Sequence, residues 1–284
     1  MQLLDLEHLG RKRVIASYLD AGDEPALVDC GPSSCLDALR AGLAEHGLEV
    51  GDLRHLVLTH IHLDHAGAAG SLVRESPGLT VHVSEVGAPH LVEPERLERS
   101  ARRLYGEDFD RLWGPLLPVP AENVKVVGDR VLDLEAFPSP GHASHHVSFL
   151  APDGSCLVGD AAGVRIPPAR WLAPVSPPPD IDVEAWERSL DAIAARRPDR
   201  LCLPHFGLVD DPQAHVERCR AALATWAERA RRGSEEEFVR AAEEDLREAA
   251  DGETAAVFQQ AGPLSQSYAG LRRYWDKREE TAAA

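Results

Sequence analysis

Basic side chains are scarce in this sequence. Its 284 residues include 30 Lys and Arg against 47 Asp and Glu, so the formal net charge is −17. Proteins that bind nucleic acids neutralise phosphates with Lys and Arg, usually from a dense patch or run, and no run of useful length occurs here. The composition argues against a nucleic-acid partner, and we expect a small-molecule substrate instead.

Long hydrophobic stretches are also absent. No segment approaches the roughly 20 apolar residues that a membrane-spanning helix needs, and residues 1–7 are too acidic and too broken for a signal peptide. The five cysteines form an odd set without CxxC spacing, which argues against a disulfide framework. A serine nucleophile in a GxSxG context is missing as well. We therefore expect a cytoplasmic protein with no membrane partner and no Ser or Cys nucleophile.

One short segment is rich in metal-ligand side chains. An apolar strand at 56–58 is followed by His60, His62, Asp64 and His65, and a helix is expected to begin at His65. Alternate residues of an extended segment point to the same side, so His60 and His62 are predicted to face together. Imidazole and carboxylate groups are the ligands that zinc and similar divalent metals prefer. The cluster predicts a metal site.

Three further apolar segments also lead into a histidine or aspartate. His142 follows the run 132–137 and a Pro-Gly pair, Asp160 follows 157–159, and His205 follows 201–204. In α/β proteins the carboxyl ends of strands are where sites are built. These three residues and the 60–65 cluster could instead be unrelated turn residues. The repeated pattern of an apolar strand followed by a histidine or aspartate favours one metal centre.

The order of these residues resembles that of the metallo-β-lactamase-fold hydrolases, over about residues 1–210. The resemblance implies that His60, His62 and His142 bind a first metal, that Asp64, His65 and His205 bind a second, and that Asp160 bridges the two. Asp29 resembles the family's Asp-x-Gly carboxylate, which supports a ligand histidine. His146 matches the family's second, non-ligand histidine in a segment that resembles GHTPGH.

The alternation of short strands with capped helices predicts an α/β fold. With the resemblance, we expect a four-layer αββα sandwich over residues 1–210 and a C-terminal helical extension over 211–284. The segment 84–120 is read as an insertion that could overhang the metals as a partial lid, and its aromatic residues are expected to be local core more often than substrate contacts. A strand is expected at 130–134, and prolines exclude helix or ladder from the loop 161–180. Helices are expected at 182–195, 212–232, 234–250, 253–261 and 264–278. The C-terminal helices could cover the core or form a homo-oligomer contact.

The implied activity is hydrolysis. Two divalent ions, zinc first with iron or manganese as alternatives, would supply a bridging hydroxide that cleaves a small ester, lactone or thioester, with Asp64 and Asp160 in the catalytic centre. The motif is similar to those of lactonase-like and hydroxyacylglutathione-hydrolase-like members. Two alternatives stay open, a mononuclear iron sulfur dioxygenase and a non-catalytic, metal-stabilised binding protein.

Overall fold

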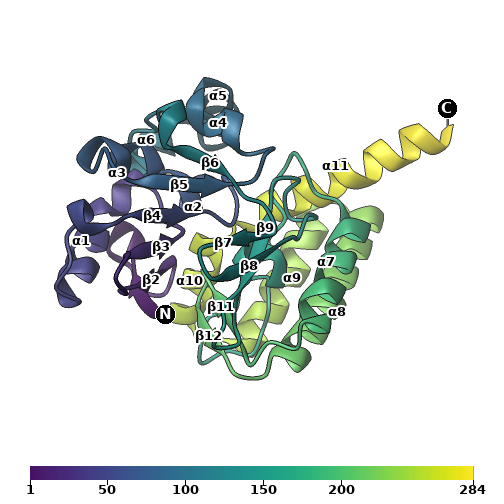
Figure 1. Ribbon diagram of the computed structural model, residues 1–284. Coiled ribbons are helices and arrows are strands. Elements are labelled where there is room, and N and C mark those ends of the chain that lie inside the picture. The colour runs from purple at the N-terminus through teal and green to yellow at the C-terminus, as the bar shows by residue number, and fades with distance from the viewer. Residues whose placement is uncertain (284) are drawn as a thin grey trace. The chain divides into compact units, whose positions relative to one another are not determined.

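The computed structural model describes residues 1–283, and the chain divides after Phe137 into two compact units. Two six-stranded sheets and their flanking helices make up a mixed α/β fold (Figure 1). This is the two-sheet, helix-flanked fold class that the sequence predicts, followed by a C-terminal group of helices.

The first sheet has the strand order β1-β2-β3-β4-β5-β6. Strands β3 to β6 are parallel to one another, and β1 and β2 extend one edge as an antiparallel hairpin. β3 is wholly buried and apolar, as expected for a central parallel strand covered on both faces. The strands are Gln2–Asp5, Ala16–Asp20, Ala26–Val28, His55–Val57, Thr80–Val83 and Val124–Val126.

Because β3 and β4 are parallel neighbours, with Val28 opposite Val57, the segments that follow them leave the same edge of the sheet. Residues 29–31 and 58–65 therefore lie close together. The helices of this unit are α1 Leu36–Glu45, α2 Leu63–Ala66, α3 Ala69–Glu75, α4 Ala88–Val92, α5 Glu95–Tyr105 and α6 Phe109–Trp113.

The second sheet has the order β12-β11-β10-β9-β8-β7. β10 and β11 are parallel, and the pairs β9/β10, β11/β12 and β7/β8 are antiparallel. The carboxyl ends of β10 and β11 therefore share an edge, at which Asp160 and His205 follow. The strands are Arg130–Val131, Leu134–Pro138, Val147–Leu150, Ser155–Leu157, Arg200–Leu203 and Gly207–Val209.

Five helices belong to the second unit: α7 Val183–Ala195, α8 Pro212–Arg232, α9 Glu235–Ala249, α10 Gly252–Ala261 and α11 Leu264–Ala283. The side chain of Asp182 caps α7 by accepting from the backbone N–H of Ala185, as the sequence indicates. α11 packs along α8 and α9 (Figure 1). Each expected helix exists, and α11 continues beyond its expected end at residue 278.

Two local predictions are wrong. The expected strand at 130–134 is instead a tight hairpin, because Leu132 takes a left-handed backbone with φ 53° that turns β7 into β8. The helix expected from His65 begins earlier, at Leu63, because His62 has the extended backbone of an N-cap. Asp64 then lies in the first helical turn, where a carboxylate is favourable.

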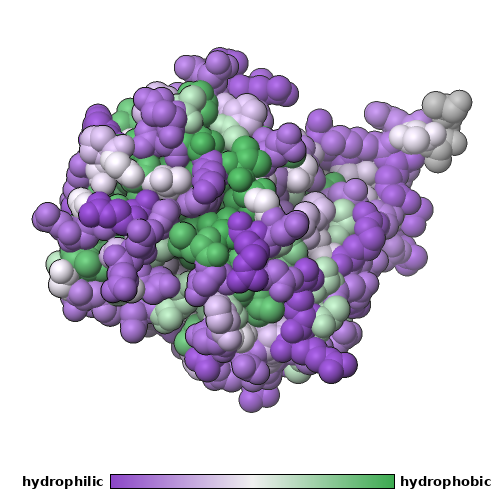
Figure 2. Space-filling view, in the orientation of Figure 1, coloured by the Kyte–Doolittle hydropathy of each residue, from purple (hydrophilic) through white to green (hydrophobic). Residues whose placement is uncertain are grey.

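Hydrophilic side chains cover most of the face of the molecule drawn in Figure 2, and apolar side chains are interspersed among them. Within residues 1–283, none of the helices is both long enough and apolar enough to cross a membrane.

Candidate metal centre

The first unit gathers four of the predicted ligands between β4 and α2. His60 and His62 lie in the connection, and Asp64 and His65 lie in α2. His60 and His65 are completely buried with ring centroids 4.0 Å apart, and His65 Nε2 is 3.8 Å from Asp64 Oδ2. Burying imidazoles this deeply is costly unless their nitrogen atoms have partners.

Asp29, directly after β3, determines where the protons of this cluster lie. Its Oδ1 accepts the backbone N–H of Thr59 at 2.8 Å, and its Oδ2 accepts the Thr59 hydroxyl at 2.8 Å. His65 Nδ1 lies 2.9 Å from the same Oδ2, and a carboxylate oxygen can only accept, so this nitrogen carries a proton. The Nε2 atom of His65 is then left with a lone pair, the form that binds a metal.

The same reasoning applies to His60. The single hydroxyl hydrogen of Thr59 is already donated to Asp29, so at the 3.0 Å contact with His60 Nδ1 the histidine donates. His60 Nε2 therefore also carries a lone pair. Two buried histidines of the motif are fixed in the tautomer that offers Nε2 as a metal ligand, and one carboxylate causes both. Asp29 thus contacts His65, as the resemblance implies, and its support of a metal ligand stays a prediction.

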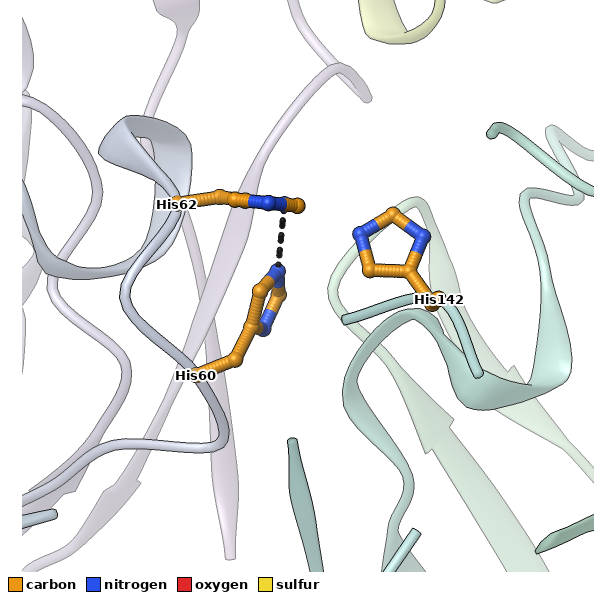
Figure 3. Close-up of side chains that lie close together, drawn as sticks. All are labelled: His60, His62 and His142. Atoms are coloured by element: carbon orange, nitrogen blue, oxygen red, sulfur yellow. Dashed lines mark hydrogen bonds between the residues drawn. The ribbon is translucent and has the colours of Figure 1, made fainter. Parts of the chain in front are cut away.

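His60 and His62 present their nitrogens to each other. His60 Nε2 lies 3.1 Å from His62 Nδ1, the contact drawn in Figure 3. Two nitrogen ligands of one tetrahedral zinc, each about 2.0–2.1 Å from the ion, would be about 3.3 Å apart. The observed spacing fits two ligands of one ion. It also fits a hydrogen bond that the ion would replace.

The second unit holds the other three predicted ligands, with His142 and His205 on either side of the Asp160 carboxylate. His142 Nε2 lies 3.4 Å from Asp160 Oδ2, and His205 Nε2 lies 3.7 Å from Asp160 Oδ1. All three side chains are buried. His142, also drawn in Figure 3, has its Nδ1 2.9 Å from the Val175 carbonyl, which can only accept. Its Nε2 therefore carries the lone pair, as in His60 and His65.

His146 holds the backbone of Asp160. Its Nε2 accepts the Asp160 backbone N–H at 3.1 Å, so the ring proton is on Nδ1, which lies 2.8 Å from Ser139 Oγ. Ser139 Oγ is in turn 2.7 Å from Ser148 Oγ. The backbone contact uses the nitrogen that a metal would need, which agrees with the non-ligand position implied by the resemblance.

The segment 84–120 packs against the motif through Leu63, the residue between His62 and Asp64. Leu63 belongs to an apolar cluster with Ala101, Phe109 and Trp113. Most of the aromatic surface of the segment is therefore local core. Its action as a lid stays a prediction.

Two conceivable nucleophiles are placed unfavourably. Burial, followed by the nearby Asp29 charge, raises the pKa of the Cys30 thiol far above its usual range, so no thiolate forms near neutral pH. The Ser144 hydroxyl donates to Asp180 at 2.8 Å rather than to a histidine. All five cysteine side chains are buried, and none is in a disulfide within residues 1–283.

The structure thus brings the seven predicted residues together in two groups, one in each unit, and their assignment as ligands stays a prediction. Sequence reasoning missed three residues that support these groups. Thr59 contacts His60, Trp186 contacts the His142 ring, and His215 contacts the Ala162 carbonyl in the turn that carries Asp160. Thr59 directly precedes His60, which is a usable signal. Trp186 and His215 lie on helices far along the chain and carry no local signal.

Comparisons with known proteins match the part of the chain that carries the seven predicted ligands. A family model described as "Metallo-beta-lactamase superfamily" matches residues 10–205. The protein ST1585 from Sulfurisphaera tokodaii, described as containing a metallo-beta-lactamase fold, is 29% identical over 181 residues, which cover 61% of this chain and 67% of that protein. Its crystal structure superposes with a TM-score of 0.65, at 24% identity, over 92% of this chain and 93% of that chain.

Two other structures share the fold. TTHA1429 from Thermus thermophilus gives a TM-score of 0.66 at 22% identity, over 95% of this chain and 89% of that chain. TTHA1623, solved in a di-iron-bound form, gives a TM-score of 0.51 at 24% identity, over 69% of this chain and 89% of that chain. Likeness at this level of identity concerns the fold alone. With the family model matching more than half of its length, this chain belongs to the metallo-beta-lactamase superfamily.

Proposed function

We propose that the protein is a hydrolase that depends on two divalent metal ions. His60, His62 and His142 would hold the first ion, Asp64, His65 and His205 would hold the second, and Asp160 would be shared. The donor set of imidazoles and carboxylates fits zinc, and it also fits iron or manganese. The di-iron form of TTHA1623 supports keeping iron as an alternative.

The observation that carries this proposal is the orientation of Asp160. Its two carboxylate oxygens face two different histidines, Oδ2 facing His142 and Oδ1 facing His205. These histidines belong to different proposed ligand sets. A carboxylate that divides its oxygens in this way is suited to bridging two ions. The lone pair on His142 Nε2 also faces a carboxylate oxygen, and a cation between these two atoms would make that contact favourable.

When bound, such a pair of ions lowers the pKa of water towards neutrality and polarises a substrate carbonyl oxygen. The protein residues fix the geometry. Asp29 and Thr59 hold His60 and His65 with Nε2 available, and the Val175 carbonyl does the same for His142. Because neither Cys30 nor Ser144 is activated, we expect water to attack directly. The substrates that suit this chemistry are small esters, lactones and thioesters.

The first test combines metal analysis with a substrate panel. The wild-type protein, supplied with zinc, should bind two equivalents by elemental analysis and hydrolyse at least one ester, lactone or thioester of the panel. Asp160→Asn should lose most of this activity, by about 100-fold or more, because a carboxamide bridges two cations poorly. Asp210→Asn, at an exposed aspartate of the same unit, is the matched control and should behave as wild type.

Three results would contradict the proposal. Activity that survives complete chelation would exclude a metal-dependent reaction, and a trapped acyl-enzyme would exclude direct attack by water. One tightly bound iron together with oxygen uptake would favour the sulfur dioxygenase alternative. Hydrolysis in ¹⁸O-labelled water should place the label in the product acid within a single turnover.

A further inference from the structure

Asp160 lies in a short turn whose carbonyl groups need external partners. The turn, η6 Gly159–Ala162, is held internally by bonds from Ala161 N to Val158 O and from Gly163 N to Asp160 O. At the end of a helical turn the last carbonyls have no partner within the turn. All four residues of the turn are buried, so water is a poor substitute, and an unpaired carbonyl would be costly.

Two buried side chains from two different helices supply those partners. Trp186 of α7 donates its Nε1–H to the Ala161 carbonyl at 2.7 Å, and His215 of α8 lies with Nε2 2.8 Å from the Ala162 carbonyl. Both rings have zero exposed surface. A carbonyl can only accept, so His215 carries its proton on Nε2. The turn that carries Asp160 is therefore held from both helices.

Trp186 also contacts the segment that carries another proposed ligand. Its ring lies edge-on to the His142 ring, with centroids 5.5 Å apart and planes at 84°. Gly141 lies directly on the start of α7, where an added Cβ would be 2.3 Å from Trp186 Cα. One residue thus touches the backbone next to Asp160 and the ring of His142.

The third proposed ligand of this unit, His205, is linked by backbone hydrogen bonds to Arg165, which follows the same turn in the chain. The Arg165 backbone N–H donates to the His205 carbonyl at 2.7 Å, and the Phe206 N–H donates to the Arg165 carbonyl at 3.1 Å. Moving η6 would move Arg165 and, with it, the loop that carries His205. The positions of Asp160 and His205 are therefore coupled through the backbone.

We propose that Trp186 and His215 are positioning residues for the metal centre, which hold the Asp160 turn in the geometry that metal binding requires. This inference rests on the proposed function. It goes beyond the ligand set, because neither side chain is a ligand or reaches one of the shared carboxylate oxygens. Burial lowers the pKa of His215 to about 4, with Arg165 and Arg218 adding to the effect, so the ring stays neutral around pH 7 and keeps its single donor on Nε2.

The first experiment removes one indole N–H. Trp186→Phe keeps an aromatic ring against His142 but loses the donor to Ala161. Trp275→Phe is the matched control, since Trp275 Nε1 donates to the Ala227 carbonyl at 2.8 Å within the same unit but away from η6. Zinc affinity is measured by competition with a chromophoric chelator, and the visible spectrum is recorded after cobalt substitution. Trp186→Phe should weaken binding by about 10-fold or more and change the cobalt spectrum, whereas Trp275→Phe should change neither.

The second experiment uses His215 and does not depend on the first. His215→Leu removes the donor to Ala162, and His215→Gln restores an amide N–H that can reach the same carbonyl. We expect His215→Leu to weaken zinc binding by about 10-fold and His215→Gln to recover most of the loss. Thermal unfolding of the metal-free proteins shows whether each variant is folded before metal is added.

The outcomes separate the two proposals. The positioning role would be overturned, and the proposed function left intact, if the wild-type protein binds two metals and Trp186→Phe and His215→Leu bind them equally well. An equal loss of zinc affinity in Trp275→Phe would overturn the positioning role, because general destabilisation and not the Asp160 turn would then control zinc affinity. Wild-type protein that binds no metal would overturn both.

Discussion

At the scale of single residues, the proposed ligands depend on neighbours that fix their protons. Asp29 takes a left-handed backbone, φ 55°, that an aspartate tolerates better than most residues. From this position it accepts from the Thr59 backbone, the Thr59 hydroxyl and His65 at once. A single carboxylate thereby sets the tautomers of two histidines. Substitutions around it should alter metal affinity without removing any ligand.

Thr59→Val tests this relay. Valine keeps the shape of threonine but loses the hydroxyl that links Asp29 to His60 Nδ1. His60 then has no fixed tautomer, and we expect zinc affinity to fall by about 10-fold in a chelator competition. Thr225→Val is the control, since Thr225 is an exposed residue of α8 whose hydroxyl donates to the Ala221 carbonyl. Unchanged zinc affinity in Thr59→Val would show that the relay does not orient His60.

The proposed ligands can be recognised in the sequence more easily than the residues that support them. His60, His142, Asp160 and His205 each follow an apolar strand, and this local pattern was enough to select them. Trp186 and His215 look like ordinary members of amphipathic helices. Their partners, the carbonyls of η6, become visible only when α7 and α8 are packed against the turn. Tertiary hydrogen bonds to the backbone leave no pattern in the sequence.

At the scale of elements, the close contact between the His142 loop and α7 requires a glycine. Gly141 has φ 131°, a conformation that L-residues rarely adopt, and its Cα lies against the backbone of Trp186. A side chain here must displace either the loop or the start of the helix. The loop that delivers His142 and the helix that supports Asp160 are thus fitted together at one residue.

Gly141→Ala should therefore destabilise the protein by about 2 kcal/mol, measured as the free energy of unfolding in urea without metal. Gly128→Ala is the control, because an added Cβ there meets nothing within 4 Å and the backbone has no positive φ. We expect the control to stay within about 0.5 kcal/mol of wild type. Equal stability of the two variants would mean that the loop moves away from α7 without cost.

The elements themselves were predicted unevenly, for physical reasons. The helices α9 and α10 have side-chain caps at their starts, Ser234 with Glu237 in a capping box and Asp251, so the sequence indicates where each begins. The end of α11 has no such signal and was placed too early. The β7/β8 hairpin was missed because Leu132 turns the chain without the glycine or asparagine that usually marks such a turn. The start of α2 was misplaced because His62 is an unusual N-cap residue.

At the scale of the whole molecule, the proposed ligands are distributed over most of the segment that matches the superfamily. The model of the superfamily extends over residues 10–205 and so includes segments of both units. Each unit carries its own pairs of proposed ligands: His60 with His62 and Asp64 with His65 in the first, and Asp160 with two histidines in the second. A division of residues 1–210 from 211–284, and any oligomer contact of the helices, stay predictions.

The proposed ligand sets can be tested by double-mutant cycles that combine the two units. His62 and His142 are assigned to the same ion, whereas His62 and His205 are assigned to different ions. A ligand bound only to the folded state raises the unfolding free energy according to its concentration and affinity. Losing one ligand of an ion should remove most of the stabilisation by that ion, so the loss of a second ligand of the same ion should add little.

We therefore expect His62→Ala and His142→Ala, each measured with excess zinc, to lower the unfolding midpoint by similar amounts, and the double variant to fall no further than either single one. His62→Ala combined with His205→Ala should come close to the sum of the two losses, because a different ion is removed by each. The same variants in chelator give the baseline that reports changes in the protein alone. Additive losses for His62 and His142 would show that they do not share an ion, and the assignment of ligands across the two units would then be wrong.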